Sequence, residues 1–123
     1  MAYSTANIKV GTLLAATDLS TTGQFRLGVI NSSGKIALAS AGARVDGAIQ
    51  NNPAIDRPVE FDILGITHVE YGGTITAGNE LEAGSSGVAV ILSGATYCIG
   101  IALESGVSGE IHPVLLKQIG AVS

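Results

Sequence analysis

Histidine and carboxylate side chains are the first groups to test for chemistry, because they bind metals and transfer protons near neutral pH. The chain has only two histidines, His68 and His112. His68 and Glu70 are two residues apart in a predicted strand, so they share one face and could begin a metal site. The spacing reveals no third ligand, and His112 directly precedes Pro113 at the expected start of a strand. We therefore expect His68 on a solvated strand face and His112 in a structural position.

Three further groups of reactive side chains each have a simple structural explanation. Glu80 and Glu82 share a strand face, as paired catalytic carboxylates can, but they flank a turn and we expect both to be exposed. Asp56 and Arg57 lie between two prolines and suit a loop ion pair or a rim contact. The single cysteine, Cys98, lies in the apolar run TYCIGIA and suits a buried, reduced side chain.

The sequence contains no motif for a nucleophile or a nucleotide. The patterns GxSxG, GxxxxGK[ST], GxGxxG and CxxC are all missing. The chain has three tyrosines, two phenylalanines and no tryptophan, which are too few for a platform on which sugars or bases stack. We therefore predict that the chain is not an enzyme and has no catalytic residues, no metal site and no cofactor.

The balance of apolar and charged residues favours a protein partner. Hydrophobic residues make up 46% of the 123 residues, and charged residues make up 13%, about half of the ~25% that is usual in soluble domains. No apolar run approaches the ~20 residues of a membrane helix, so the apolar surplus suits an interface with other protein chains. The net charge is −4, and the six basic residues are scattered singly, which argues against binding of nucleic acid.

Short apolar segments bounded by turn residues dominate the chain, and helix signals are poor. Glycine, serine and asparagine clusters separate these segments. The sequence therefore predicts an all-β fold, a small β-barrel or β-sandwich of short antiparallel strands. One short helical turn is allowed near 13–19 or 53–56. The predicted strands are 8–14, 25–30, 35–39, 46–49, 59–64, 66–71, 80–81, 88–91, 99–103 and 111–116.

The sequence also resembles itself at a fixed spacing. SSGKIALASAGARVDGAI begins at Ser32, and SSGVAVILSGATYCIGIAL begins 53 residues later (85 − 32). This similarity predicts two related halves, about 23–64 and 78–116, from an internal duplication. The halves form one β domain at 11–123, and 1–10 forms an N-terminal arm or first strand. Chance similarity between two segments rich in glycine and alanine is the alternative explanation. The glycines expected to form structural turns are Gly34, Gly47, Gly87 and Gly100.

Several stretches along the chain carry a family-like pattern. The clearest are ITAGNEL at 75–81 and IGIALESGVSGEIHPVLL at 99–116, and DGAIQNNPAIDRPVEFDILGIT precedes them. Together they resemble the small head decoration, or cement, proteins of tailed bacteriophages. The resemblance covers most of the chain and rests on glycine and small-residue patterns. Asn79 and Gly84 depart from it, at positions where acidic residues are commoner.

This resemblance implies an all-β structural protein of the virion without catalytic activity. Such a protein binds the outer surface of the capsid, contacts the major capsid protein and stabilises the head by bridging neighbouring capsid subunits. Assembly takes place in the host cytoplasm. The resemblance also implies a homo-oligomer, with a trimer as the first expectation. From the scattered basic residues and the short apolar runs we expect no nucleic-acid or membrane partner.

Two segments are candidates for contact with the capsid or with other subunits. The segment AYSTAN at 2–7 is small, polar and uncharged and could add as a strand to a sheet edge, but an ordinary frayed terminus explains it almost as well. The loop at 51–58 contains two prolines, which limit the entropy lost on docking. The candidate contact residues are Ala2, Tyr3, Ser4, Thr5, Asn51, Asn52, Pro53, Asp56 and Arg57.

Three other classes of protein are alternatives to a head decoration protein. GVSGEI superficially matches a motif of trimeric β-barrel nucleotide hydrolases like the dUTPases, but their other acidic and serine motifs are missing. A lipoyl or biotinyl carrier domain also has twofold β repeats, but Lys35, a lysine in a turn, lacks the expected flanking residues. A structural subunit of another assembly, such as a tail or an encapsulating shell, differs from a head protein only through the family resemblance.

Overall fold

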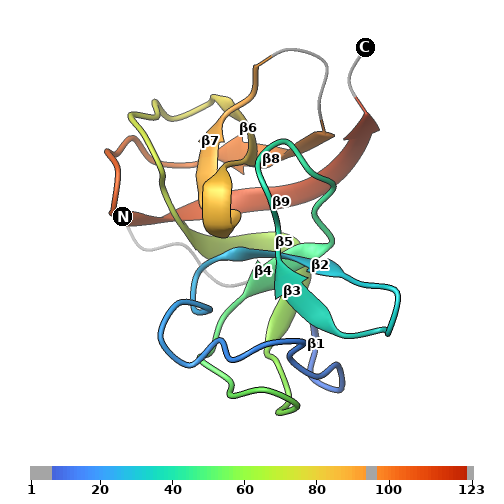
Figure 1. Ribbon diagram of the computed structural model, residues 1–123. Helices are drawn as coiled ribbons and strands as arrows, with labels where there is room; N and C mark the ends of the chain where they lie inside the picture. Colours follow the sequence, from blue (N-terminus) through green and yellow to red (C-terminus); the bar gives the residue numbers. More distant parts are fainter. Residues whose placement is uncertain (1–6, 94–96, 122–123) are drawn as a thin grey trace.

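One curled antiparallel sheet forms the framework of the computed structural model, which describes residues 7–93 and 97–121 (Figure 1). Its nine strands curl into a half-barrel, so the predicted all-β fold is confirmed. The hydrogen-bonded order is β3-β2-β4-β5-β9-β8-β6-β7, and β1 pairs with β5 outside this path. The strands are β1 (Asn7–Val10), β2 (Leu27–Ile30), β3 (Ile36–Leu38), β4 (Gly47–Ile49), β5 (Phe61–Glu70), β6 (Glu80–Ala83), β7 (Ala89–Ile91), β8 (Tyr97–Ala102) and β9 (Ile111–Ala121).

Every strand predicted from the sequence has a counterpart, and the differences concern length. The predicted strands at 59–64 and 66–71 are one continuous strand, β5. Gly65, between them, adopts a φ of 99°, which only glycine adopts readily, so the strand continues through this position. The described residues contain one helical turn, a 3-10 turn at Ser85–Gly87, and it lies at neither of the expected places. Within the same ranges, no helix has the length and apolar character needed to cross a membrane.

The two halves of the sheet pair their strands in the same register. In the first half β2 pairs with β3 and β4, and β4 pairs with β5; in the second half β6, β7, β8 and β9 repeat this pattern. Each pair of the first half has a counterpart in which both residues lie 53 positions later, as 81 − 28 = 53. Examples are Gly28–Leu38 and Leu81–Ile91, Gly28–Gly47 and Leu81–Gly100, and Ala48–Asp62 and Ile101–Leu115. Duplication as the origin of this repeat stays a prediction.

Left-handed backbone conformations also recur at the repeat spacing. Phe25 and Asp56 have φ of 66° and 62°, which is rare for residues with a side chain. The residues 53 positions later are both glycines, Gly78 and Gly109, with φ of 92° and 90°. The second half therefore uses glycine where the first half places a side chain in a strained conformation.

Two of the four predicted turn glycines lie in turns, and two do not. Gly34 and Gly87 have φ of 76° and 79° and lie in the tight turns that precede β3 and β7. Gly47 and Gly100 lie inside β4 and β8 instead. A β-carbon at Gly47 would lie 2.5 Å from a carbonyl oxygen of β5, and one at Gly100 would collide with a carbonyl oxygen of β9. This repeated glycine therefore allows neighbouring strands to approach closely.

The buried apolar side chains form two clusters. One cluster fills the first half and consists of Ala15, Leu19, Ile36, Ile49, Val59 and Phe61. The other fills the second half and includes Val69, Tyr71, Ile75, Leu81, Ala83, Ala89, Ile99, Ala102 and Val114, together with Leu27, Ala39, Val45 and Ala48 from the first half. Because first-half side chains contribute to the second cluster, the halves pack against each other.

Candidate contact surface

Two groups of residues with catalytic potential come into contact. Cys98 Sγ lies 3.9 Å from Glu80 Oε2, and His112 lies between two carboxylates. The described parts of the chain contain no group of three or more His, Cys, Asp or Glu side chains that could hold a metal ion. His68 is half-buried on β5, so its strand face is less solvated than expected. Its neighbour Glu70 pairs with Arg26, with 3.3 Å between Glu70 Oε1 and Arg26 Nε. The Glu70 carboxylate therefore joins the end of β5 to the residue that precedes β2, and it faces a cation of the chain itself.

Glu80 and Glu82 lie in different surroundings, so the prediction that both are exposed is wrong for Glu82. Glu80 is exposed, but Glu82 is only 7% exposed and accepts hydrogen bonds from the backbone N–H and the hydroxyl of Ser93. The reason is that the chain after β7 continues alongside β6, where Leu92 donates its N–H to the Glu80 carbonyl at 2.9 Å, and this brings Ser93 to the Glu82 carboxylate. Cys98 is buried with a free thiol, as predicted.

His112 lies at the start of β9, as predicted, between two carboxylates. Its Nδ1 is 2.8 Å from Glu104 Oε1, and its Nε2 is 3.1 Å from Glu110 Oε1. Hydrogen bonds to Glu104 and then Glu110 raise the pKa of His112. The ring lies against Tyr71, with 4.9 Å between the centroids, and the Tyr71 hydroxyl donates to the Glu104 carbonyl at 2.7 Å. Burial raises the pKa of Tyr71 to about 12, so its hydroxyl remains a donor. These contacts fasten the loop before β9.

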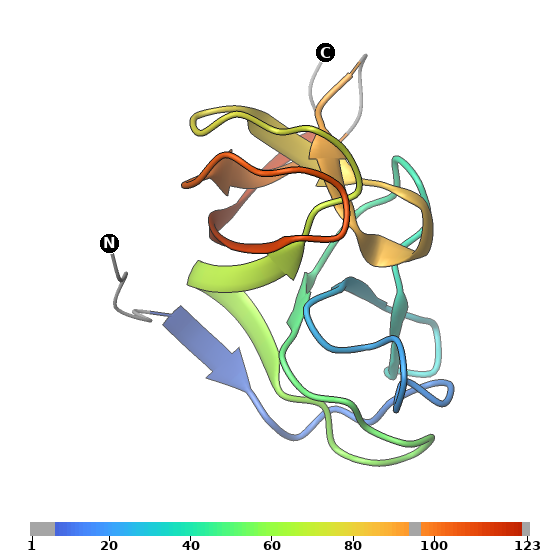
Figure 2. The same ribbon diagram turned by 90° about the vertical axis from the view of Figure 1, so that its left-hand side faces the viewer.

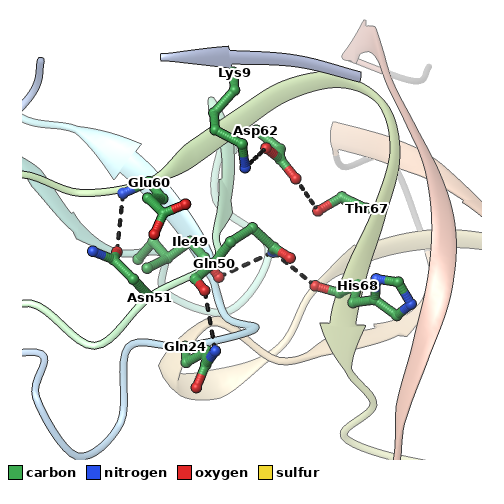
Figure 3. A network of polar contacts seen from close by, with 9 residues as sticks. All are labelled: Lys9, Gln24, Ile49, Gln50, Asn51, Glu60, Asp62, Thr67 and His68. Atoms are coloured by element: carbon green, nitrogen blue, oxygen red, sulfur yellow. Dashed lines mark hydrogen bonds and ion pairs between the residues drawn. The ribbon is translucent and has the colours of Figure 1, made fainter. Parts of the chain in front are cut away.

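The predicted contact loop, residues 51–58, is shaped by two asparagines, of which Figure 3 shows Asn51. The Oδ1 of Asn51 accepts the backbone N–H of Glu60 at 2.9 Å. Asn52 exchanges two hydrogen bonds with Gln24, each of 3.0 Å. The asparagines therefore hold the loop in place through bonds within the chain. Of the predicted contact residues here, Asn52, Asp56 and Arg57 are exposed, Asn51 is half-buried and Pro53 is buried.

The tip of this loop is a tight turn with an apolar side chain. The N–H of Arg57 donates to the Ala54 carbonyl at 3.1 Å, and Asp56 holds the left-handed position of the turn. The Asp56 carboxylate pairs with Lys35 at 2.6 Å, not with Arg57. Ile55 is 55% exposed. The loop therefore presents a fixed aliphatic side chain beside an exposed ion pair.

The predicted N-terminal arm meets the described chain at β1. The candidate contact residues Ala2, Tyr3, Ser4 and Thr5 lie outside the described residues. On β1, Lys9 Nζ lies 2.7 Å from Oδ1 of Asp62, a carboxylate that is buried on β5 (Figure 3). The other oxygen of Asp62 accepts the Thr67 hydroxyl at 2.7 Å. Because a buried charge is costly without partners, this network fixes β1 to the sheet.

An apolar hollow of about 450 Å³ beside β1 was not identified from the sequence. It is lined by Ile8 of β1, Ile30 of β2, and Ile63 and Leu64 of β5, with Asp46 at its edge. These side chains come from strands that are far apart in the sequence, so only the pairing register brings them together. Asp46 forms an ion pair with Arg44, with 2.9 Å between Asp46 Oδ2 and Arg44 Nη2. The hollow adds apolar surface beside β1.

The described residues thus define an all-β half-barrel that offers fixed loops and apolar surface. No protein family matches the sequence, and no curated protein does either. Among solved structures, the chain shares its fold with the N base of head fiber gp8.5 in bacteriophage phi29, with a TM-score of 0.71 and 19% sequence identity. The match covers 89% of this chain and 95% of that chain. The resemblance to phage head proteins is therefore confirmed at the level of the fold.

Proposed function

We propose that this chain is a structural protein of a phage head and binds the outer surface of the capsid. The observation that carries the proposal is the fold shared with a head-fiber base over nearly the whole length of both chains. The sequence resemblance to decoration proteins supports the same role. We further propose that this structural role involves no enzymatic activity.

In this role the protein bridges neighbouring copies of the major capsid protein. DNA packed in a head presses outward on the shell. A clamp across two subunits opposes their separation, because the free energy of its interface is lost when they part. An interface of about 1,000–2,000 Å² per copy is enough, since many copies act on one shell. A rigid surface with few reactive groups suits this purpose.

The proposed contacts are the segment at 2–5, which adds as a strand to a capsid sheet edge, and the loop at 51–58. In the loop, the exposed Ile55 enlarges the contact that the neighbouring Asp56 and Arg57 make. Copies of the protein associate on the shell around a symmetry axis, as a trimer by resemblance to decoration proteins.

Co-sedimentation with phage heads tests the proposal. Purified protein is mixed with undecorated heads in expanded and unexpanded forms, and the bound copies are counted. We expect saturable binding to expanded heads at a fixed ratio to the capsid subunits. Absence of binding to both forms would contradict the proposal and direct the search to another assembly.

A further inference from the structure

A second loop of the molecule is built like the proposed contact loop. The first, residues 51–58, joins β4 to β5, and the second, residues 104–111, joins β8 to β9. Each contains a tight turn whose third residue has a positive φ. The hydrogen bonds that close the two turns run from Arg57 to Ala54 and from Glu110 to Val107, both at 3.1 Å.

Both loops are tied to the rest of their half by the same backbone bonds. The first loop bonds to Ala15 and Leu19, and the second bonds to Tyr71 and Ile75. The bonds of the first loop are Ala15 N–H to Arg57 (3.0 Å), Asp56 N–H to Ala15 (2.9 Å) and Leu19 N–H to Pro53 (2.9 Å). Those of the second are Tyr71 N–H to Glu110 (2.8 Å), Gly109 N–H to Tyr71 (2.8 Å) and Ile75 N–H to Gly106 (2.9 Å). The two loops therefore have matching backbones.

Each turn exposes one aliphatic side chain. Ile55 is 55% exposed at the second position of the first turn, and Val107 is 50% exposed at the first position of the second turn. Side chains hold both loops as well, the first through Asn51 and the second through His112. A tip that is already fixed loses little conformational entropy on docking. The loops project from different parts of the molecule in both views (Figures 1 and 2).

From this duplication we infer that the protein has two equivalent capsid contacts, one in each half, which engage two neighbouring copies of the same capsid protein. The inference rests on the proposed function. A shell of identical subunits presents the same recess many times, so a chain that carries two loops of the same backbone shape, each with an exposed aliphatic side chain, fits two recesses at once. An exposed aliphatic tip fits a recess lined by apolar side chains. Simultaneous engagement strengthens binding by about 10²–10⁴-fold over one loop alone.

Charged substitutions at the two tips test the inference. Ile55→Asp, Val107→Asp and the double variant are compared with the wild type in binding to expanded heads. Ile91→Asp is the matched control, because Ile91 is 46% exposed and lies on β7, outside both loops. Thermal unfolding of each variant verifies the fold. We expect each single variant to bind at least about 100-fold more weakly, to a similar degree, and the double variant to lose saturable binding. The control should bind like the wild type.

The outcomes separate this inference from the proposed function. If the wild type binds heads and only one of the two tip variants weakens binding, the protein has a single contact loop and the inference is wrong, although the proposed function stands. The same conclusion follows if either single variant is as defective as the double variant at every protein concentration. If the wild type binds no heads, the proposed function fails and the inference fails with it.

Discussion

The two halves of the molecule share a strand register, but they place their large and small buried side chains at different positions. Phe61 dominates the first cluster, and the equivalent position in the second carries the smaller Val114. The second cluster receives its aromatic ring from Tyr71, and the equivalent residue in the first cluster is Ala15. The two are equivalent because Ala15 forms a parallel bridge to Ile36 and Tyr71 forms one to Ala89. Two further pairs of equivalent positions differ in side-chain size: the first half has Gly28 where the second has Leu81, and it has Ile36 where the second has Ala89. Backbone pairing is thus conserved, while the filling of each core is a separate solution to close packing.

The loops differ in the same manner. Neutral asparagines hold the loop of the first half, whereas a histidine between two glutamates holds the loop of the second. The equivalent of His112 in the first half is Val59, which is fully buried. At this one position the first half therefore uses apolar packing, whereas the second half uses a titratable side chain.

The largest expected effect is the loss of the first-half aromatic ring. Phe61→Ala removes a fully buried ring and leaves a cavity, so the free energy of unfolding should fall by about 3–5 kcal/mol. Val114→Ala, at the equivalent position, deletes far less volume and should cost clearly less. Urea unfolding of both variants measures the difference. Equal losses would show that the two cores are filled alike, against the comparison above.

The positions of most strands can be predicted from local sequence patterns, whereas features that depend on contacts between distant segments cannot. Apolar runs and turn residues locate the strands, because side-chain alternation and turn chemistry are local properties. Two features depend instead on which segments lie beside each other in the fold. They are the continuous strand through Gly65 and the burial of Glu82. The same holds for the candidate site. The prolines of the loop at 51–58 mark it in the sequence, but the loop at 104–111 contains no proline and is recognisable only by its repeated hydrogen bonds.

A smaller effect should follow from adding a side chain at the left-handed turn of the second half. Gly78 has a φ of 92°, and a β-carbon there would meet nothing within 4 Å, so Gly78→Ala isolates the backbone cost. We expect a loss of about 1–2 kcal/mol in the free energy of unfolding. Gly73→Ala is the matched control, because its β-carbon also has open space and its φ is not left-handed. If both variants are equally stable, the strain attributed to the equivalent Phe25 is absent too.

The smallest expected effect is a pH dependence that arises from the cluster of His112, Glu104 and Glu110 in the second half. The pKa of His112 is raised above 6.5 by its carboxylate partners, so its stabilising contribution is complete below pH 6.5 and is lost as the pH rises through the raised value. The pKa of Glu110 is lowered below 4.5, mainly by the hydrogen bond to His112, so its contribution is present above pH 4.5 and is lost as the pH falls through the lowered value. The cluster therefore stabilises the fold most between pH 4.5 and 6.5.

His112→Val gives the second half the residue that the first half has at this position and removes the titrating ring. As the pH is raised from about 6 to about 8, the range in which histidine loses its proton, the urea concentration at the unfolding midpoint of the wild type should decrease. The variant should be less stable at the lower pH and show a flatter dependence, since only its carboxylates remain. His68→Gln, which leaves the cluster intact, should retain the wild-type slope. An unchanged slope in His112→Val would mean that the charge between Glu104 and Glu110 contributes nothing to holding this loop, and that packing against Tyr71 fixes it as packing of Val59 does in the first half.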